Sequence, residues 1–320
     1  MRVLYSNCIG SHIIENGKVV KTRSFTESER ISRCEALAEA KSIPEELELG
    51  ASFPAALNAN KSLDEAALRV GLASFRPADY RETLLALCRT RLRAAVSFDS
   101  LLIQAVHAAD ELAKVSNRLA ARLREWYELH CPEWSRAQPE HERFAASIIE
   151  SPREELLARL GLSAEQSVGA ALPKPSLSAA LGLAAALLEL YRQRNRIIGY
   201  IEAVMAENAP NLAALGGPLL GAKLIAAAGS LDRLAKLPAS TVQLLGAERA
   251  LFRHLATGAK APKHGLILAH PLLAEAKPGQ RGKIARALAD KLALAARLDR
   301  FKGAFEGEAM RKELEVRFGK

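Results

Sequence analysis

The sequence is poor in cysteine and aromatic residues and has no long apolar run, and each shortage narrows the class of protein. It contains four widely separated cysteines, Cys8, Cys34, Cys88 and Cys131. They form no C-x-x-C pair, which favours reduced thiols, buried or incidental, over disulfides or a zinc ribbon. The longest apolar stretch, Leu181 to Leu188, is far shorter than the ~20 residues of a membrane-spanning helix. No apolar run follows a basic start at Met1, so we expect no secretory signal and a soluble cytoplasmic protein.

The sequence also lacks the usual phosphate-binding loops. Gly216 to Lys223 reads GGPLLGAK, but a P-loop needs Lys directly after the second Gly, and here Ala222 intervenes. No G-x-G-x-x-G follows a strand, so neither a dinucleotide pocket nor a methyl-donor pocket is indicated. His107, Asp110 and Glu111 share a helical face, but such a triplet is far more typical of a solvated face than of a metal site. We therefore predict no catalytic group, metal or cofactor in this chain.

The chain does have the balance of a folded, helix-rich protein. It has 320 residues, 49% of them hydrophobic and 25% charged, which excludes wholesale disorder. Aromatic residues make up 5%, and the abundance of Ala, Leu, Arg and Glu favours helix.

Charge is divided unevenly along the chain. Residues 210–320 contain 19 Lys and Arg against 9 Asp and Glu, whereas residues 1–209 contain 26 against 27. A nucleic-acid-binding module joined to a neutral remainder has this asymmetry, because Lys and Arg release condensed counterions when they meet phosphates. Charge alone leaves a solvated basic face equally open.

The first 25 residues or so have the pattern of a small sheet. Two β-favouring runs, His12 to Ile14 and Val19 to Val20, flank the turn residues Asn16 and Gly17, and an Asn-Gly there predicts a hairpin. Val3 to Tyr5 predicts a further strand. Shorter helices are expected up to Arg93, interrupted at Pro44, Pro54, Gly71 and Pro77. We predict a small α/β domain over residues 1–95.

Residues 96–209 predict a long antiparallel helical hairpin. Apolar residues recur alternately four and three apart from Phe98 to His130, a coiled-coil spacing, although a buried bundle helix is the alternative. The returning helix has the predicted seam Leu181, Ala184, Leu188, Tyr191, Asn195 and Ile198. Polar Ser116 and Asn195 would fix the register. Residues 140–175 would form the far tip, and residues 210–320, with shorter helices punctuated by glycine, predict an all-helical globule.

Two stretches resemble the archaeal form of the Nop-domain scaffold proteins of box C/D ribonucleoprotein particles. The first runs from Ser97 to Trp134, SFDSLLIQAVHAADELAKVSNRLAARLREWYELHCPEW. The second begins at Gly221 with GAKLIAAAGSLDRLAKLPASTVQLLGAERALFRHL and continues through APKHGLILAHPLL and RGKIARALADKLALAARLD to Asp299. With the helix between them they cover about two thirds of the chain, while residues before about 90 match only in layout.

The resemblance implies a division of labour. The N-terminal domain would bind fibrillarin, the coiled coil would pair two copies, and the Nop domain, 210–320, would bind guide RNA with a kink-turn-binding protein. The particle would methylate RNA at 2′-oxygens. This chain would be a non-catalytic frame, with S-adenosylmethionine bound by the partner methyltransferase. Two alternatives remain: an RNA-modifying enzyme with its own active site, and a purely structural coiled-coil protein.

The resemblance also implies site residues. The family's GAEK motif stands here as Gly246, Ala247, Glu248 and Arg249, and its ALFR motif as Ala250, Leu251, Phe252 and Arg253. We expect Gly246 to open a helix with free N–H groups for a phosphate or carbonyl. The alternative for this helix is an amphipathic one with Leu251 and Phe252 in the core. Further RNA or partner contacts are expected from Lys260, Lys263, His264, His270, Arg281 and Lys283. For the two histidines, which have no carboxylate or Cys partner for a metal, a position facing the core is the alternative.

The sequence departs from the family pattern at several positions. Arg249 replaces the usual Lys, Ala261 stands where Thr commonly precedes Pro-Lys, and Leu268-Ala269 replaces a more polar or aromatic pair before His270. The absence of a Lys/Glu-rich tail before Lys320 favours the archaeal over the nucleolar type.

Overall fold

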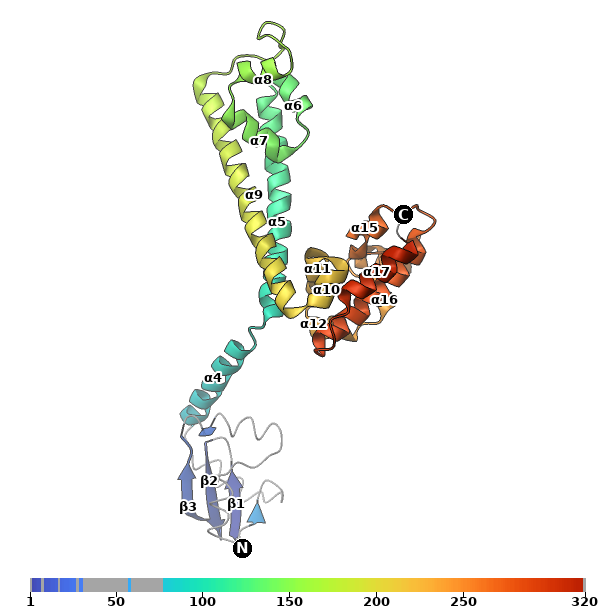
Figure 1. Cartoon of the computed structure of the whole chain (residues 1–320). Coiled ribbons are helices and arrows are strands. Elements are labelled where there is room, and N and C mark those ends of the chain that lie inside the picture. The colour runs from blue at the N-terminus through green and yellow to red at the C-terminus, as the bar shows by residue number, and fades with distance from the viewer. Residues whose placement is uncertain are drawn as a thin grey trace. The chain divides into compact units, whose positions relative to one another are not determined.

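A computed structural model describes residues 2–6, 9–16, 18–26, 29–30, 57–58 and 77–318 (Figure 1). The chain divides into two compact units, Met1–Val96 and Ser97–Lys320. A small sheet lies in the first unit and long helices dominate the second, so the predicted fold class, mainly α with a small N-terminal α/β domain, is confirmed. The predicted breakers Pro44, Pro54 and Gly71 lie outside the described residues.

The first unit contains a four-stranded sheet in the order β3-β2-β1-β4. Its strands are β1 (Arg2–Ser6), β2 (Gly10–Glu15), β3 (Lys18–Ser24) and β4 (Leu57–Asn58). β2 pairs antiparallel with both β1 and β3, and β4 pairs parallel with β1. The predicted hairpin is confirmed: Glu15 is opposite Lys18, and Asn16 has a φ of 49°, a left-handed conformation that Asn tolerates. Pro77 does not interrupt a helix but begins one, α4 (Pro77–Ala94).

Two antiparallel helices form a rod in the second unit, α5 (Phe98–Tyr127) and α9 (Lys174–Asn208) (Figure 1). Ser97 caps α5, because its hydroxyl accepts a hydrogen bond from the Ser100 N–H at 3.4 Å. The predicted hairpin of two long helices is thus present.

The phase of the seam on α9 differs from the prediction. Its buried residues are Ala180, Ala184, Leu187, Ile201 and Met205. Among the predicted seam residues Ala184 is buried, and Leu181, Leu188, Tyr191 and Ile198 are half-buried beside the buried line. Asn195 is exposed and does not lie on the seam, whereas Arg194 is half-buried. Apolar residues stand next to each other along α9, so two phases one residue apart fit the sequence equally well.

The rod joins two separate hydrophobic cores. The tip core contains Leu123, Tyr127 and Leu187, together with residues of the short tip helices. The base core contains Leu102, Ile201 and Met205, together with the C-terminal helices. Between them, Ser116 is fully buried and its hydroxyl has no hydrogen-bond partner, and neither has Nε of Arg194. The middle of the rod therefore contains buried polar atoms without hydrogen bonds, which contribute less to stability than paired ones.

Three short helices cover the tip: α6 (Pro132–Ala137), α7 (His141–Glu150) and α8 (Arg153–Arg159). Arg124 on α5 holds the first two, α6 and α7: it donates to the carbonyls of Ser135 at 2.6 Å and Gln138 at 2.5 Å, and to Nδ1 of His141 at 2.9 Å. Its guanidinium also lies 4.4 Å from the ring centre of Phe144. Among the described residues, two cysteines have free thiols: Cys131 at the tip, which is buried, and Cys88 on α4, which is exposed.

Eight α-helices and one 3-10 helix follow the rod within the described residues, as the predicted helical globule requires. They are α10 (Pro210–Gly216), α11 (Pro218–Ala228), α12 (Leu231–Lys236), α13 (Ala239–Leu244), α14 (Glu248–Thr257), η1 (Leu266–Ala269), α15 (Pro271–Ala274), α16 (Arg281–Arg300) and α17 (Gly307–Phe318). Hydrogen bonds of Asn211 and Asp299 join the start of α10, the end of α16 and the start of α17. Asp299 accepts hydrogen bonds from the N–H groups of Asn211 and Leu212, each at 2.9 Å, and so caps α10.

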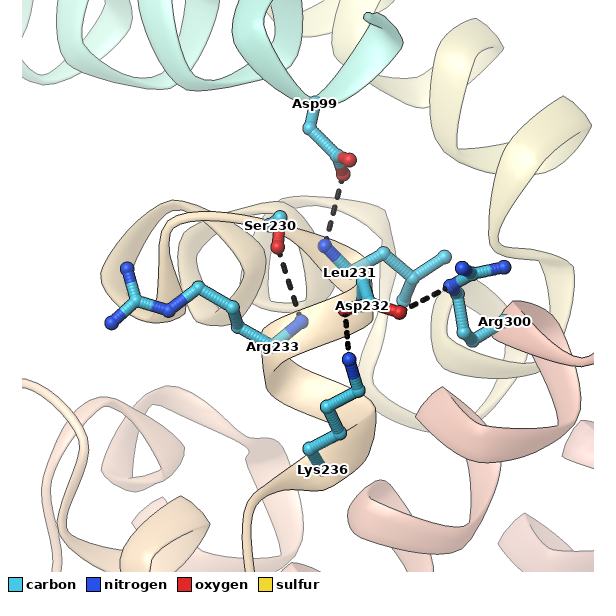
Figure 2. A network of polar contacts seen from close by, with 7 residues as sticks. All are labelled: Asp99, Ser230, Leu231, Asp232, Arg233, Lys236 and Arg300. Atoms are coloured by element: carbon cyan, nitrogen blue, oxygen red, sulfur yellow. Dashed lines mark hydrogen bonds and ion pairs between the residues drawn. The ribbon is translucent and has the colours of Figure 1, made fainter. Parts of the chain in front are cut away.

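The globule is attached to the base of the rod by polar contacts (Figure 2). The Asp99 carboxylate on α5 accepts a hydrogen bond from the Leu231 N–H at 3.0 Å, at the start of α12. On the same helix Asp232 pairs with Lys236 at 2.5 Å and with Arg300 at 2.8 Å. The hydrogen bond from Lys236 and that from Arg300 hold the pKa of Asp232 below its usual value. A further ion pair, Lys223 with Asp110 at 2.7 Å, ties α11 to α5.

Among the described helices, none alone has the length and apolar character needed to cross a membrane. Helices α10 and α11, bent by 117° relative to each other, meet that test only as a pair.

Candidate RNA-binding surface

The turn before α14 is built around Gly246. Its φ of +83° is left-handed, which favours glycine. The Gly246 N–H donates to the Glu248 carboxylate at 2.6 Å, and the Ala247 N–H donates to the Leu244 carbonyl at 2.8 Å. Helix α14 begins at Glu248, so Gly246 lies two residues before it and its own N–H is bound by the Glu248 side chain. Among the described residues, no hydrogen bond occupies the N–H groups of Glu248, Arg249 and Ala250, so the expected free N–H groups are in the first turn rather than at Gly246.

Helix α14 lies on the surface with an apolar face open. None of its residues is buried, and Phe252 and Leu255 are 67% and 70% exposed. Leu251 is half-buried and Phe252 is not in the core, so the alternative of an ordinary packed helix does not hold for Phe252. Arg249 and Arg253 are both exposed one turn apart. An exposed aromatic side chain next to two arginines suits a partner that carries negative charge and also has flat rings that can stack on the aromatic side chain.

The loop after α14 is fixed against α13. The Gly265 N–H donates to the Gln243 carbonyl at 2.9 Å, and the Leu266 N–H donates to the Leu245 carbonyl at 2.7 Å. The Gln243 side-chain amide donates to the Lys263 carbonyl at 2.6 Å. Lys260 and Lys263 are exposed on this loop. The backbone is thus held while both ammonium groups face solvent.

Three other predicted site residues have different environments. Lys283 is exposed and His264 is half-buried. Arg281 is held by the backbone, because Nε donates to the Ala276 carbonyl at 3.0 Å and Nη2 to that of Ala274 at 3.3 Å. It therefore fixes the turn before α16.

His270 is not on the surface. It is 6% exposed, its Nε2 lies 3.1 Å from the Leu215 carbonyl, and its Nδ1 accepts from the Leu272 N–H at 3.3 Å. An accepting Nδ1 leaves the proton of neutral imidazole on Nε2, which donates to Leu215. Of the two positions expected for His270, facing RNA or facing the core, the structure shows the second, and the RNA contact is not made: this side chain caps α15 from inside the core.

His270 makes stability depend on pH. Burial lowers the pKa of this imidazole below its usual value. The stabilisation is therefore present above the unfolded-state pKa, about 6.5, and is lost as pH falls below it. We expect the urea midpoint of the second unit to fall between pH 7.5 and pH 5, and to fall less in His270→Gln. An identical fall in both proteins would contradict this role.

Unpaired cations concentrate around α14. Residues 249–286 contain eight Lys and Arg against one Asp or Glu. Elsewhere in the globule several cations are paired: Lys236 and Arg300 with Asp232, Lys291 with Glu313, and Arg311 with Glu315. Within the part of the chain that is described, none of the eight has an acidic partner. Arg281 is held by backbone carbonyls, and the other seven are Arg249, Arg253, Lys260, Lys263, Lys277, Lys283 and Arg286. This stretch carries the free positive charge that a phosphate backbone requires.

A family model for Nop, described as "snoRNA binding domain, fibrillarin", matches residues 108–320. The chain belongs to the Nop family. The matched segment contains α14, the loop after it and the whole stretch of unpaired cations. The resemblance stated from the sequence is thus confirmed at the level of the family.

Relatives of this Nop-family chain come from archaea and fungi. A NOP5 family protein of Methanocaldococcus jannaschii is 40% identical over 233 residues, 68% of this chain and 56% of that protein. Nucleolar protein 58 of Schizosaccharomyces pombe is 38% identical over 247 residues, 71% of this chain and 49% of that protein. The chain spans about half the length of these relatives. A chain in the crystal structure of a fibrillarin/Nop5p complex aligns with 99% of this chain and 98% of its own length, at 24% identity and a TM-score of 0.45, too low to bear on function.

Sequence reasoning missed Arg286 in this Nop domain. It lies on α16, is exposed, and has no acidic partner among the described residues. The signal that could have found it is its spacing of four from Gly282, which puts both residues on one side of the helix.

Proposed function

We propose that this chain is a non-catalytic scaffold of a box C/D ribonucleoprotein particle. Its Nop domain binds guide RNA together with a kink-turn-binding protein. The first unit, which lies outside the family match, binds fibrillarin, and the rod pairs two copies. The particle methylates RNA at 2′-oxygens in the cytosol of an archaeon, and fibrillarin holds S-adenosylmethionine. The observation that carries the proposal is the set of unpaired cations around α14, inside the segment that matches an RNA-binding family.

Helix α14 supports contact with both RNA and protein. Its arginines offer planar donors that match phosphate oxygens, and Phe252 offers an exposed ring. Its apolar face is too exposed to contribute to the core, so it is available to a partner. Exposed apolar side chains on the rod, Leu101, Val115 and Tyr200, similarly support self-association.

Reconstitution tests the proposal. The full chain is mixed with fibrillarin, a kink-turn-binding protein and a box C/D guide RNA, and assembly, dimer formation and methylation of a complementary RNA are scored. We expect salt-sensitive binding to RNA that already carries the kink-turn protein, and weak binding to the RNA alone or to the kink-turn protein alone. Methylation is expected only with fibrillarin present. Methyl transfer by the isolated chain would contradict the scaffold role.

Charge reversal on α14 tests the site itself. Arg249→Glu with Arg253→Glu is expected to weaken binding to the RNA and kink-turn protein by at least about tenfold, because attraction to phosphates becomes repulsion. The matched control is Arg233→Glu with Lys312→Glu, which changes net charge equally at exposed positions away from α14. If both double variants weakened binding to the RNA and kink-turn protein equally, at unchanged melting temperature, the assigned role of α14 would be contradicted.

A further inference from the structure

A pocket of about 630 Å³ lies where the base of the rod meets the globule. The start of α5 and the end of α9 line it from the rod, and the starts of α10 and α12 and the end of α16 line it from the globule. Four of its lining residues, Asp99, Leu231, Asp232 and Arg300, are drawn in Figure 2. None of the residues that line this junction pocket belongs to α14 or to the loop after it. A segment bound here would touch the rod and the globule at once.

Two phenylalanines contribute apolar surface to the junction pocket. Phe98, at the start of α5, is half-buried and packs against the base core, as does Leu298 near the end of α16. Phe305 lines the same pocket, yet 56% of its surface is exposed. An exposed aromatic side chain beside a hollow contributes little to the core and is typical of an anchor position in a protein interface.

The turn that carries Phe305 is held on both sides by one side chain. Before it, the Ala304 carbonyl accepts a hydrogen bond from Nδ2 of Asn211 at 3.3 Å. After it, the Glu306 N–H donates to Oδ1 of Asn211 at 2.6 Å. Phe305 thus projects from a fixed backbone, and a partner that binds it loses little free energy to ordering this turn.

The lining of the junction pocket has the opposite charge to the globule around it. Its carboxylates outnumber its cations, whereas residues 210–320 contain 19 Lys and Arg against 9 Asp and Glu. The carboxylates belong to Asp99, Glu207, Asp232 and Asp299, and the cations to Arg300 and Lys302. Arg300 already pairs with Asp232 at 2.8 Å. The net charge of the lining is therefore negative.

This charge distinguishes between possible occupants of the pocket. It argues against RNA, because phosphates and carboxylates repel each other, and it favours a segment that carries Lys or Arg. Asp99 and Asp299 accept hydrogen bonds at the starts of α12 and α10, where the helix dipoles offset part of their charge. Glu207 is exposed at the end of α9 and forms no ion pair with another described residue. It is therefore the lining carboxylate with the least compensated charge.

We propose that the junction pocket binds a basic peptide segment of a protein partner. An aromatic or large aliphatic side chain of the segment packs against Phe98 and Phe305, and a neighbouring Lys or Arg pairs with Glu207. The inference goes beyond the proposed function, because it adds a protein contact at a surface that shares no residue with the RNA-binding one.

Three fluorescein-labelled peptides of equal length test the pocket. Gly-Gly-Arg-Phe-Lys-Gly-Gly is the probe, Gly-Gly-Glu-Phe-Glu-Gly-Gly reverses its charge, and Gly-Gly-Arg-Ala-Lys-Gly-Gly lacks its ring. Each is titrated with the full chain at low salt and followed by fluorescence anisotropy. The probe is expected to bind at least about tenfold more tightly than either reference peptide, because only the probe combines a ring with positive charge. Equal binding of all three peptides, or no binding of the probe, would overturn the proposal.

Two variants with matched controls locate the bound probe. Phe305→Ala should weaken probe binding by about tenfold, whereas Phe301→Ala, which removes an exposed ring outside the pocket, should leave it unchanged. Glu207→Lys should weaken probe binding by about tenfold at low salt and by less at about 0.5 M KCl, because salt screens the repulsion. Glu202→Lys is its control, since Glu202 is exposed on the same helix and does not line the pocket.

The variants also define the results that would contradict the pocket. Probe binding that is unchanged in Phe305→Ala or in Glu207→Lys, or that weakens equally in a variant and its control, would overturn the proposal. Displacement of the probe by a short RNA duplex would assign the pocket to RNA and would overturn it as well.

Discussion

Gly265→Ala is expected to lower the free energy of unfolding of the second unit by about 3 kcal/mol or more, in the range of severe backbone and packing defects. A Cβ at this position would lie 1.9 Å from the Leu245 carbonyl oxygen and 2.8 Å from that of Leu244. Both obstacles are backbone atoms, so no side chain can rotate away. The chain can accept the methyl group only by giving up the hydrogen bonds that Gly265 and Leu266 donate to α13 and the residue after it.

The functional result of Gly265→Ala follows from what those bonds hold. They fix the loop that carries Lys260 and Lys263, so RNA binding should weaken together with stability. Urea denaturation by circular dichroism measures the first effect and anisotropy the second. Gly199→Ala is the matched control: it has no atom within 4 Å of the added Cβ and lies within α9, where alanine should stabilise by about 0.5 to 1 kcal/mol. A Gly265→Ala protein as stable as wild type would refute the close approach.

Asn211→Ala should destabilise the second unit by about 3 to 5 kcal/mol, the range for breaking a buried polar network. Asn211 is 2% exposed, and its Nδ2 donates to Asp299 at 2.9 Å. Its Oδ1 accepts from the N–H groups of Glu306 at 2.6 Å and Gly307 at 2.8 Å, at the start of α17. Alanine leaves these donors, and part of the Asp299 carboxylate, without the partner that Asn211 supplies.

Asn208→Ala provides a nearby comparison for the Asn211 network. Asn208 is half-buried and its Nδ2 makes one hydrogen bond, to the Val204 carbonyl at 3.0 Å. Its loss should cost about 1 kcal/mol, the value of a single ordinary hydrogen bond. Thermal or urea unfolding of the two variants, measured side by side, distinguishes them. Equal losses would mean that the network around Asn211 adds nothing beyond one bond.

The architecture of this chain was largely readable from its sequence, because periodicity and turn chemistry are local. The Asn-Gly turn and the alternation on α5 and α9 produced the observed hairpin and rod. The phase of the α9 seam was not readable. Leu187 and Leu188 stand next to each other, and only packing against α5 and the tip helices decides that Leu187 is buried.

The sequence predicted the positive charge of the candidate site, but not whether each side chain there is buried, paired or exposed. The basic stretch and α14 follow from composition and motif. That His270 is buried depends on the Leu215 carbonyl, 55 residues away. That Arg281 is held by carbonyls, while Arg286 lines one hollow with Lys260 and Lys263, depends on how the chain turns before α16. Contacts between distant segments leave no local pattern in a sequence, so these assignments needed the fold.

The separation of the rod into two cores has a consequence for how the molecule melts. The buried hydroxyl of Ser116, which makes no hydrogen bond, lies where neither core extends. Little cooperativity can pass through such a zone, so calorimetry should resolve two transitions within the second unit. Amide exchange should protect the tip of the rod and the base of the rod to different degrees. Mutations that loosen Tyr127 and its neighbours would then spare the surface around α14. The distal part of the rod could diverge in sequence without disturbing recognition.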